Sequence, residues 1–240
     1  MLPKKLEKDL IIDAVFELRF VPNINSNAVF GILYNIFKDK YPNVENLNIL
    51  DIPFQIREKD SNLLYQPHYR LQNELFQIRL GPRVLAVDIL DEYPGWQKYF
   101  SEIKSIISSF IEANIAADFR RIALRYINLL EYKSIKDTLN IEFKINNEKY
   151  NKRKQSIITT VIEDENFQHN LRISENIEIE HTAKGINTQG TVLDIDTYTN
   201  DIHDFVTSYE EIIDSAHSKE KNFFFSLLQN SYLQTLRPSY

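Results

Sequence analysis

The longest stretch with hydrophobic residues on both alternating faces covers residues 119–132, which read FRRIALRYINLLEY. β-branched and aromatic residues are frequent in it, as they are in strands that are buried on both sides. Two arginines, Arg121 and Arg125, share one of these faces. We therefore predict a central strand, and we expect both guanidinium groups to need partners because an unpaired buried charge is costly.

The rest of the chain shows the same two periodicities. Residues 10–20 alternate apolar and polar positions, which predicts a strand with one buried face. Helical spacing predicts three helices, at residues 27–39, from about 95 to 113, and at 201–229, the last bent or interrupted in its polar middle at 215–221. Gly81-Pro82 predicts a hairpin between its flanking strands. Strands are expected at 47–58 (weak), 63–72, 75–81, 84–90, 141–145, 156–163, 167–174, 177–182 and 189–197.

This order of elements predicts an α+β fold of antiparallel sheets, each covered by a long helix. The two similar halves, residues 1–116 and 117–240, are joined by the central strand and packed as one structural unit, because no Pro/Gly/Ser-rich linker separates them. A pseudo-duplication is indicated by this order of elements, although no repeat is visible at the level of residues.

Composition narrows the classes of function. The 240 residues include no cysteine, which excludes disulfides, thiolate metal sites and cysteine nucleophiles and favours a cytoplasmic location. The formal net charge of −6 argues against a surface that binds nucleic acid throughout. We expect neither a membrane span nor a signal peptide, because no run approaches about 20 apolar residues and no apolar segment follows the first lysines.

Arg121, Arg125, Asp194 and Asp196 are the candidate binding residues. The arginines could hold a phosphate or carboxylate in a cleft, and the two aspartates, about 7 Å apart on one strand face, could hold a divalent cation. We favour a structural network in which Asp13, Glu17 or Asp194 neutralises the arginines, because a partly buried guanidinium is costly without a carboxylate. No metal site is assigned.

Lys149, Lys152, Arg153 and Lys154 form the only dense positive run and are a candidate nucleic-acid loop. We favour a solvated loop, because no nucleic-acid motif accompanies the run. His203, Glu210 and His217 lie about 10 Å apart along one side of the last helix, too far for one metal ion. Motifs for phosphate-binding loops, nucleophilic serines and zinc hydrolases are missing, so we assign no catalytic residue and no cofactor.

Several segments resemble a known family. Residues 10–20 (LIIDAVFELRF), Tyr93-Pro94-Gly95-Trp96, residues 121–128 (RIALRYIN) and 193–196 (LDID) are similar, in this order, to segments of the sporadically distributed bacterial proteins of the TIGR04255 family, and residues 216–217 and 223–228 resemble its C-terminal helix. The chain departs from the family at Leu10, where proline is frequent, at Ala123, where glycine is frequent, and at Leu129-Leu130, where an arginine is common. The resemblance implies a bacterial protein without a settled activity, with an occurrence like that of mobile or defence-related genes.

From these observations we expect a non-enzymatic binding or protein-interaction subunit of an accessory system, a class that includes defence systems. Its partner would be a second copy of itself or another protein. The alternative is an enzyme or binder that acts on a nucleotide or nucleic acid through a cleft with the four candidate arginine and aspartate residues. We do not favour nucleic acid as the partner.

Overall fold

The computed structural model describes residues 2–142, 144–145, 148–149, 155–181 and 186–240. Its helical segments are α1 (Ser26–Phe37), the 3-10 turn η1 (Asn48–Asp51), α2 (Phe54–Arg57), α3 (Trp96–Glu112), α4 (Ile135–Thr138), α5 (Phe205–Leu227) and α6 (Asn230–Thr235). Its strands are β1 (Lys5–Leu6), β2 (Ile11–Pro22), β3 (Asn43–Asn46), β4 (Tyr69–Gln72), β5 (Phe76–Leu80), β6 (Val84–Ile89), β7 (Ala116–Glu131), β8 (Lys144–Ile145), β9 (Glu148–Lys149), β10 (Ser156–Asp164), β11 (Phe167–His181), β12 (Ile186–Thr199) and β13 (Pro238–Ser239). In the described ranges, no helix is long and apolar enough to cross a membrane.

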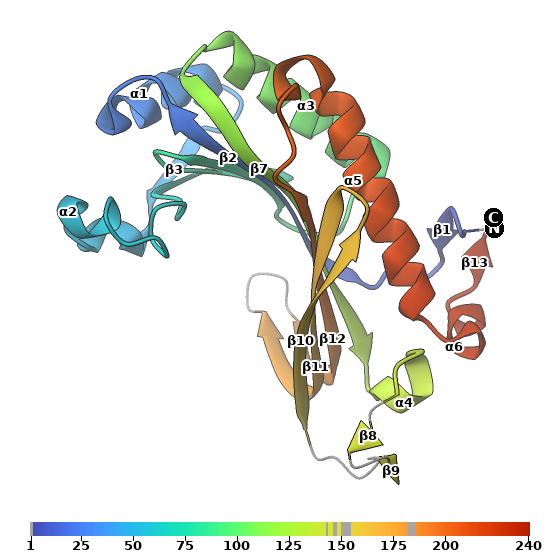
Figure 1. Ribbon diagram of the computed structural model, residues 1–240. Helices are drawn as coiled ribbons and strands as arrows, with labels where there is room; N and C mark the ends of the chain where they lie inside the picture. The colour runs from blue at the N-terminus through green and yellow to red at the C-terminus, as the bar shows by residue number, and fades with distance from the viewer. Residues whose placement is uncertain (1, 143, 146–147, 150–154, 182–185) are drawn as a thin grey trace. The chain divides into compact units, whose positions relative to one another are not determined.

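Nine strands form one antiparallel sheet in the order β10-β11-β12-β7-β2-β6-β5-β4-β3, and α3 and α5 pack against it (Figure 1). Two further pairs, β1 with β13 and β8 with β9, stand outside this sheet. The α+β class expected from the sequence is confirmed. Most of the strands expected in separate sheets lie in this single one, whereas β8, from the strand expected at 141–145, lies outside it.

The strand predicted at residues 119–132 is confirmed as β7, which lies inside the sheet between β12 and β2. The predicted hairpin is also confirmed: β5 and β6 pair antiparallel, with Leu80 opposite Leu85. Gly190 shows how closely β12 approaches β7, because a Cβ atom on it would lie 2.5 Å from the carbonyl oxygen of Leu130. Only glycine fits there without a shift of backbone.

Three expectations about single elements are wrong. Residues 47–58 form η1 and α2 instead of a strand, since Pro53 has no N–H for a ladder and stands at the N-cap of α2. Residues 167–181 form the single strand β11. The helix α5 continues without interruption through its polar middle, where Lys219 is held by two carboxylates.

The division at residue 116 stays a prediction. The chain forms two compact units, each built from separate stretches: unit 1 comprises residues 1–12, 125–197 and 216–240, and unit 2 comprises residues 13–124 and 198–215.

In unit 2, one face of the strands carries the core. Alternate residues of β2 are fully buried there, namely Ala14, Phe16, Leu18 and Phe20. The α3 stripe of Tyr99, Ile103, Ile106, Ile107 and Phe110 is also buried, and the rings of Phe20 and Phe110 meet edge to face at 4.8 Å. The opposite face of β2 presents Asp13, Val15, Glu17 and Arg19, which are all partly exposed. Unit 2 therefore has one apolar and one charged sheet face.

The only tryptophan of the chain, Trp96, begins α3 in unit 2. Its indole N–H donates to Asp214 on α5 at 3.0 Å, and its ring stacks on Phe100 at 4.9 Å between centroids. The hydrogen bond connects α3 with α5, and the stacking contact lies within α3.

In unit 1, the core lies between the strands and the C-terminal half of α5. It includes Leu130, Leu171, Ile173, Leu193 and Ile195 from strands, and Phe224 and Leu227 from the helix. Glu220 lies on this apolar stripe of α5 and is only 5% exposed. Burial raises the pKa of its carboxyl to about 8.

Candidate binding site

The two arginines of β7 have carboxylate partners. Arg125 makes a bidentate pair with Asp194, in which Nε donates to Oδ1 at 2.7 Å and Nη2 to Oδ2 at 2.6 Å. Arg121 donates to Glu17 at 2.6 Å, and its guanidinium lies 4.4 Å from the ring centroid of Tyr198. Glu17 and Asp194 are the partners that the favoured structural network requires. The role of these arginines in binding stays a prediction.

Asp196 also has an interaction partner, so neither aspartate of the predicted pair is free. No group of three or more His, Asp or Glu side chains in the described part of the chain could hold a metal ion. Of the predicted basic loop, Lys149 lies in β9, while Lys152, Arg153 and Lys154 lie outside the described residues.

A second group of arginines lies at the charged face of unit 2 and was missed in the sequence. Glu17 is shared, because the oxygen that accepts from Arg121 also accepts from Nε of Arg19 at 2.7 Å. The Arg19 guanidinium lies 4.8 Å from the ring centroid of Tyr65. One carboxylate thus serves two guanidinium groups, and each of these lies over an aromatic ring.

The β5–β6 turn brings a further arginine, Arg83, to this end of the sheet. The Phe20 N–H donates to the carbonyl of Arg83 at 3.0 Å, which places Arg83 beside β2. Arg83 reaches Glu58 only at 3.4 Å, and its buried Nε has no acceptor among the described residues. A buried donor without an acceptor is unfavourable, and a ligand oxygen would relieve it.

Arg57 pairs with no carboxylate in the described part of the chain. Its Nε donates to the Ile52 carbonyl at 2.9 Å, and its Nη1 lies 2.9 Å from Nδ1 of His68. Because a guanidinium only donates, the imidazole must accept and be neutral. Burial, and then the charge of Arg57, lower the pKa of His68 to about 4. His68 is therefore neutral near pH 7, and Arg57 carries the positive charge of this pair.

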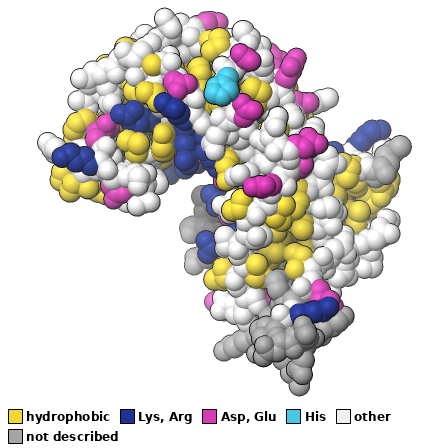
Figure 2. Space-filling view, in the orientation of Figure 1, with side chains coloured by type: hydrophobic (Ala, Val, Ile, Leu, Met, Phe, Trp, Pro, Cys, Tyr) yellow, Lys and Arg dark blue, Asp and Glu magenta, His cyan; other side chains and the backbone are white. Residues whose placement is uncertain are grey.

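We call Arg19, Arg57 and Arg83, together with Tyr65, Glu17 and Glu58, the arginine corner. Figure 2 shows Lys and Arg side chains gathered over the strands of unit 2, where Figure 1 labels β2, β3 and β7. The side chains of Arg19 and Arg83 are 33% and 23% exposed, so both are accessible from solvent. Planar donors that are partly exposed and held on a rigid sheet suit a carboxylate or phosphate ligand.

Little in the sequence indicates this corner. Its members come from β2, from the irregular segment around α2 and from the β5–β6 turn, and no motif links them. The one available signal was the pairing of Glu17 with Arg19 on the polar side of an otherwise apolar strand.

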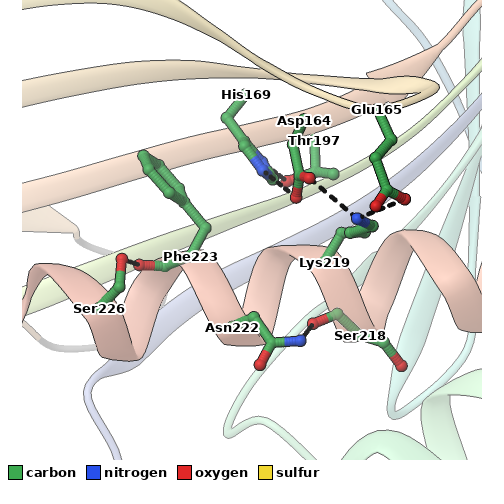
Figure 3. A network of polar contacts seen from close by, with 9 residues as sticks. All are labelled: Asp164, Glu165, His169, Thr197, Ser218, Lys219, Asn222, Phe223 and Ser226. Carbon is green, nitrogen blue, oxygen red and sulfur yellow. Dashed lines mark hydrogen bonds and ion pairs between the residues drawn. The ribbon is translucent and has the colours of Figure 1, made fainter.

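A polar network in unit 1 has the acid, histidine and hydroxyl sequence of a catalytic triad, but its histidine and hydroxyl are buried. Nδ1 of His169 lies 2.8 Å from the Thr197 hydroxyl, and its Nε2 lies 3.4 Å from Asp164 (Figure 3). The exposed fraction of His169 is 1% and that of Thr197 is 0%, and the Phe223 ring stacks on the imidazole at 4.3 Å. No substrate can reach the hydroxyl in this arrangement.

The same network joins α5 to the β10–β11 hairpin. Lys219 donates to Asp164 at 2.8 Å and to Glu165 at 2.9 Å (Figure 3). Its hydrogen bond is the largest cause that lowers the pKa of Asp164, and burial lowers the pKa of His169. The contacts have the character of a structural clamp.

No protein-family model matches the chain, and no curated protein matches it.

Proposed function

We propose that the protein is a non-enzymatic interaction subunit that binds an acidic segment of a partner protein at the arginine corner. The observation that carries this proposal is the incomplete neutralisation of the corner: among the described residues, Arg57 has no carboxylate partner and the buried Nε of Arg83 has no acceptor. Carboxylates of a partner would supply both. Arginine and tyrosine are also the residue types that most often dominate the energy of protein interfaces.

An acidic protein segment suits the corner better than nucleic acid does. Glu17 and Glu58 lie among the arginines, and they would repel a continuous row of phosphates. Nucleic-acid backbones bind where many cations act together, whereas the whole chain carries a formal net charge of −6. Carboxylates spaced along a peptide can place themselves between the fixed acids.

The test uses a fluorescein-labelled oligoglutamate peptide and fluorescence anisotropy. Arg57→Gln and Arg83→Gln should each weaken binding by about 10- to 100-fold, since a hydrogen bond between charged groups contributes about 1.5–3 kcal/mol. Arg120→Gln is the matched control, because Arg120 is 56% exposed on β7 and pairs with Asp118 outside the corner. Equal losses in all three variants, or no binding by the unmodified chain, would remove the proposal.

A labelled oligothymidylate in the same assay tests the alternative of nucleic-acid binding. If it binds, with an affinity that falls linearly in log[salt] and that depends on Arg57 and Arg83, the corner is a phosphate-binding site instead. Loss of affinity in Arg125→Gln or Asp194→Asn would instead support the predicted cleft of Arg121, Arg125, Asp194 and Asp196.

We further propose, from the family resemblance, that the subunit works in the cytoplasm as part of a bacterial accessory system, a class that includes defence systems. Purification of the tagged chain from its native cells should retain a partner that the Arg57→Gln variant loses and the Arg120→Gln variant keeps. A partner that both variants keep would show that the corner is not its binding site.

We also propose that the sheet descends from two similar halves. In support, β2 and β7 are neighbours, each pairs on its other side with the strand that precedes a long helix (β6 before α3, β12 before α5), and each helix follows that strand along the chain. An experimental structure in which residues 11–112 and 116–227 superpose no better than unrelated segments would contradict this origin.

A further inference from the structure

The terminal strand of unit 1, β10, has an outer edge that pairs with no other strand in the described ranges. β10 is the first strand in the order of the large sheet, and β11 is its only neighbour among the strands described. It is nine residues long, and its sequence SIITTVIED has no proline and no charge before Glu163. Long terminal strands normally carry lysine, proline or a bulge, because a free row of N–H and C=O groups pairs readily with another chain.

Each face of β10 carries two branched apolar residues. Ile157 and Val161 on one face are 60% and 55% exposed. On the other face, Ile158 and Ile162 are partly buried against the core of unit 1. Figure 2 shows hydrophobic side chains gathered along the line between the strands of unit 1 and α5. A chain that paired with β10 would cover both sets.

The opposite end of the sheet lacks these properties. Its terminal strand β3 has four residues, Asn43, Val44, Glu45 and Asn46, and Glu45 forms an ion pair with Arg70 at 3.0 Å. A short strand with a charge is a typical protected edge. The open edge of β10 is therefore a local feature and not a general property of the sheet.

We propose that β10 pairs antiparallel with β10 of a second copy of this chain. Residues that lie opposite each other in a sheet point to the same face. A two-fold axis perpendicular to the sheet keeps each face of one copy on the same side as that face of the other copy. Two opposed residues therefore have residue numbers that are both odd or both even. Only registers centred on a residue satisfy this condition.

The register centred on Thr159 fits the sequence best. It sets Ile157 opposite Val161 twice and Thr159 opposite itself, which covers the four exposed apolar side chains of two copies. Branched and threonine pairs of this kind stabilise neighbouring strands. A register centred on Thr160 would set Ile157 opposite Glu163, which buries an apolar side chain beside a charge.

This self-complementarity selects a second copy as the occupant, ahead of an extended segment of another protein. A strand from another protein would have no reason to match the alternation of Ile157, Thr159 and Val161. The proposal is independent of the arginine corner, which lies in unit 2, so either can fail alone.

The absence of cysteine permits a direct test with single-cysteine variants of the full chain. Thr159→Cys should form a covalent dimer under mild oxidation, because paired strands bring opposed Cα atoms to about 4.5–5.5 Å, within disulfide range. Val44→Cys on β3 is the control and should stay monomeric. Cross-linking that is no faster for Thr159→Cys than for Val44→Cys would overturn the proposal.

Sedimentation velocity over a concentration series supplies the second test. Val161→Lys should weaken the dimer at least about tenfold, equivalent to about 1.4 kcal/mol, because it sets an ammonium group opposite Ile157. Val44→Lys should leave association unchanged, and circular dichroism verifies that both variants fold. An unmodified chain that stays monomeric throughout the series, or a dimer that Val161→Lys leaves intact, would refute β10 pairing between copies.

Discussion

Replacement of Glu220 by glutamine should stabilise the protein increasingly as pH rises. Glu220 is buried on the apolar stripe of α5, and its pKa is raised from 4.5 to about 8. The unfolded chain releases this proton near pH 4.5, whereas the folded chain keeps it until about pH 8. The stability that protonated Glu220 contributes is therefore fully present below pH 4.5, is lost as pH rises from 4.5 to about 8, and does not change at higher pH.

The magnitude follows from the separation of the two pKa values. About 3.5 pH units at about 1.4 kcal/mol each give about 5 kcal/mol of stability lost by pH 9, and about 3 kcal/mol by pH 7. Glutamine has nearly the same shape and no charge to desolvate. The Glu220→Gln variant should thus match the unmodified chain at pH 4.5 and exceed it by about 5 kcal/mol at pH 9.

Urea unfolding followed by far-UV circular dichroism at pH 5, 7 and 9 measures this difference. The difference between variant and unmodified chain is the required quantity, because His68 and His169 have lowered pKa values and add a pH dependence of their own. Glu211→Gln, at an exposed position on the same helix, is the control. A difference that does not grow with pH would refute the burial argument.

Two further predictions concern packing and pairing in the sheet. Arg79→Met should lower the free energy of unfolding in urea at pH 7 by about 3 kcal/mol. Asp88 is 2% exposed and accepts from Arg79 at 2.8 Å and 2.5 Å, so the substitution leaves a buried carboxylate without its cation. An unchanged urea midpoint would contradict this. Gly190→Ala should lower the free energy of unfolding by about 1–3 kcal/mol, because its Cβ would clash with the Leu130 carbonyl. Gly31→Ala in α1 should raise it by up to about 1 kcal/mol, because an added Cβ there would meet no described heavy atom within 4 Å beyond the neighbouring backbone of its own helix. Thermal unfolding of both glycine variants measures these effects, and a reversed order would refute them.

Periodicity predicted the regular core well. Residues 119–132 and 10–20 were assigned correctly because their side chains alternate over more than ten residues, and a strand that long has few other ways to bury them. The partner of Arg125 was among those expected for the same reason, since Asp194 lies on the polar face of another strand.

The irregular parts could not be predicted from the same signal. Residues 47–58 are rich in Ile and Leu, which favours a strand, but the segment forms the short helices η1 and α2 and their flanking residues. The arginine corner depends on where that segment lies on the sheet, and the contact of His169 with Thr197 depends on the register of two strands 28 residues apart. Register and loop placement are tertiary properties that local sequence does not specify.

The position of Trp96 provides an intrinsic fluorescence signal for the unfolding of one unit. Its indole is the only strong natural fluorophore and lies wholly within unit 2, between α3 and the first turns of α5. Fluorescence should therefore record the melting of unit 2 alone, while circular dichroism sums both units. Coincident transitions would identify one cooperative folding unit, and separated ones would give two, without any label or substitution.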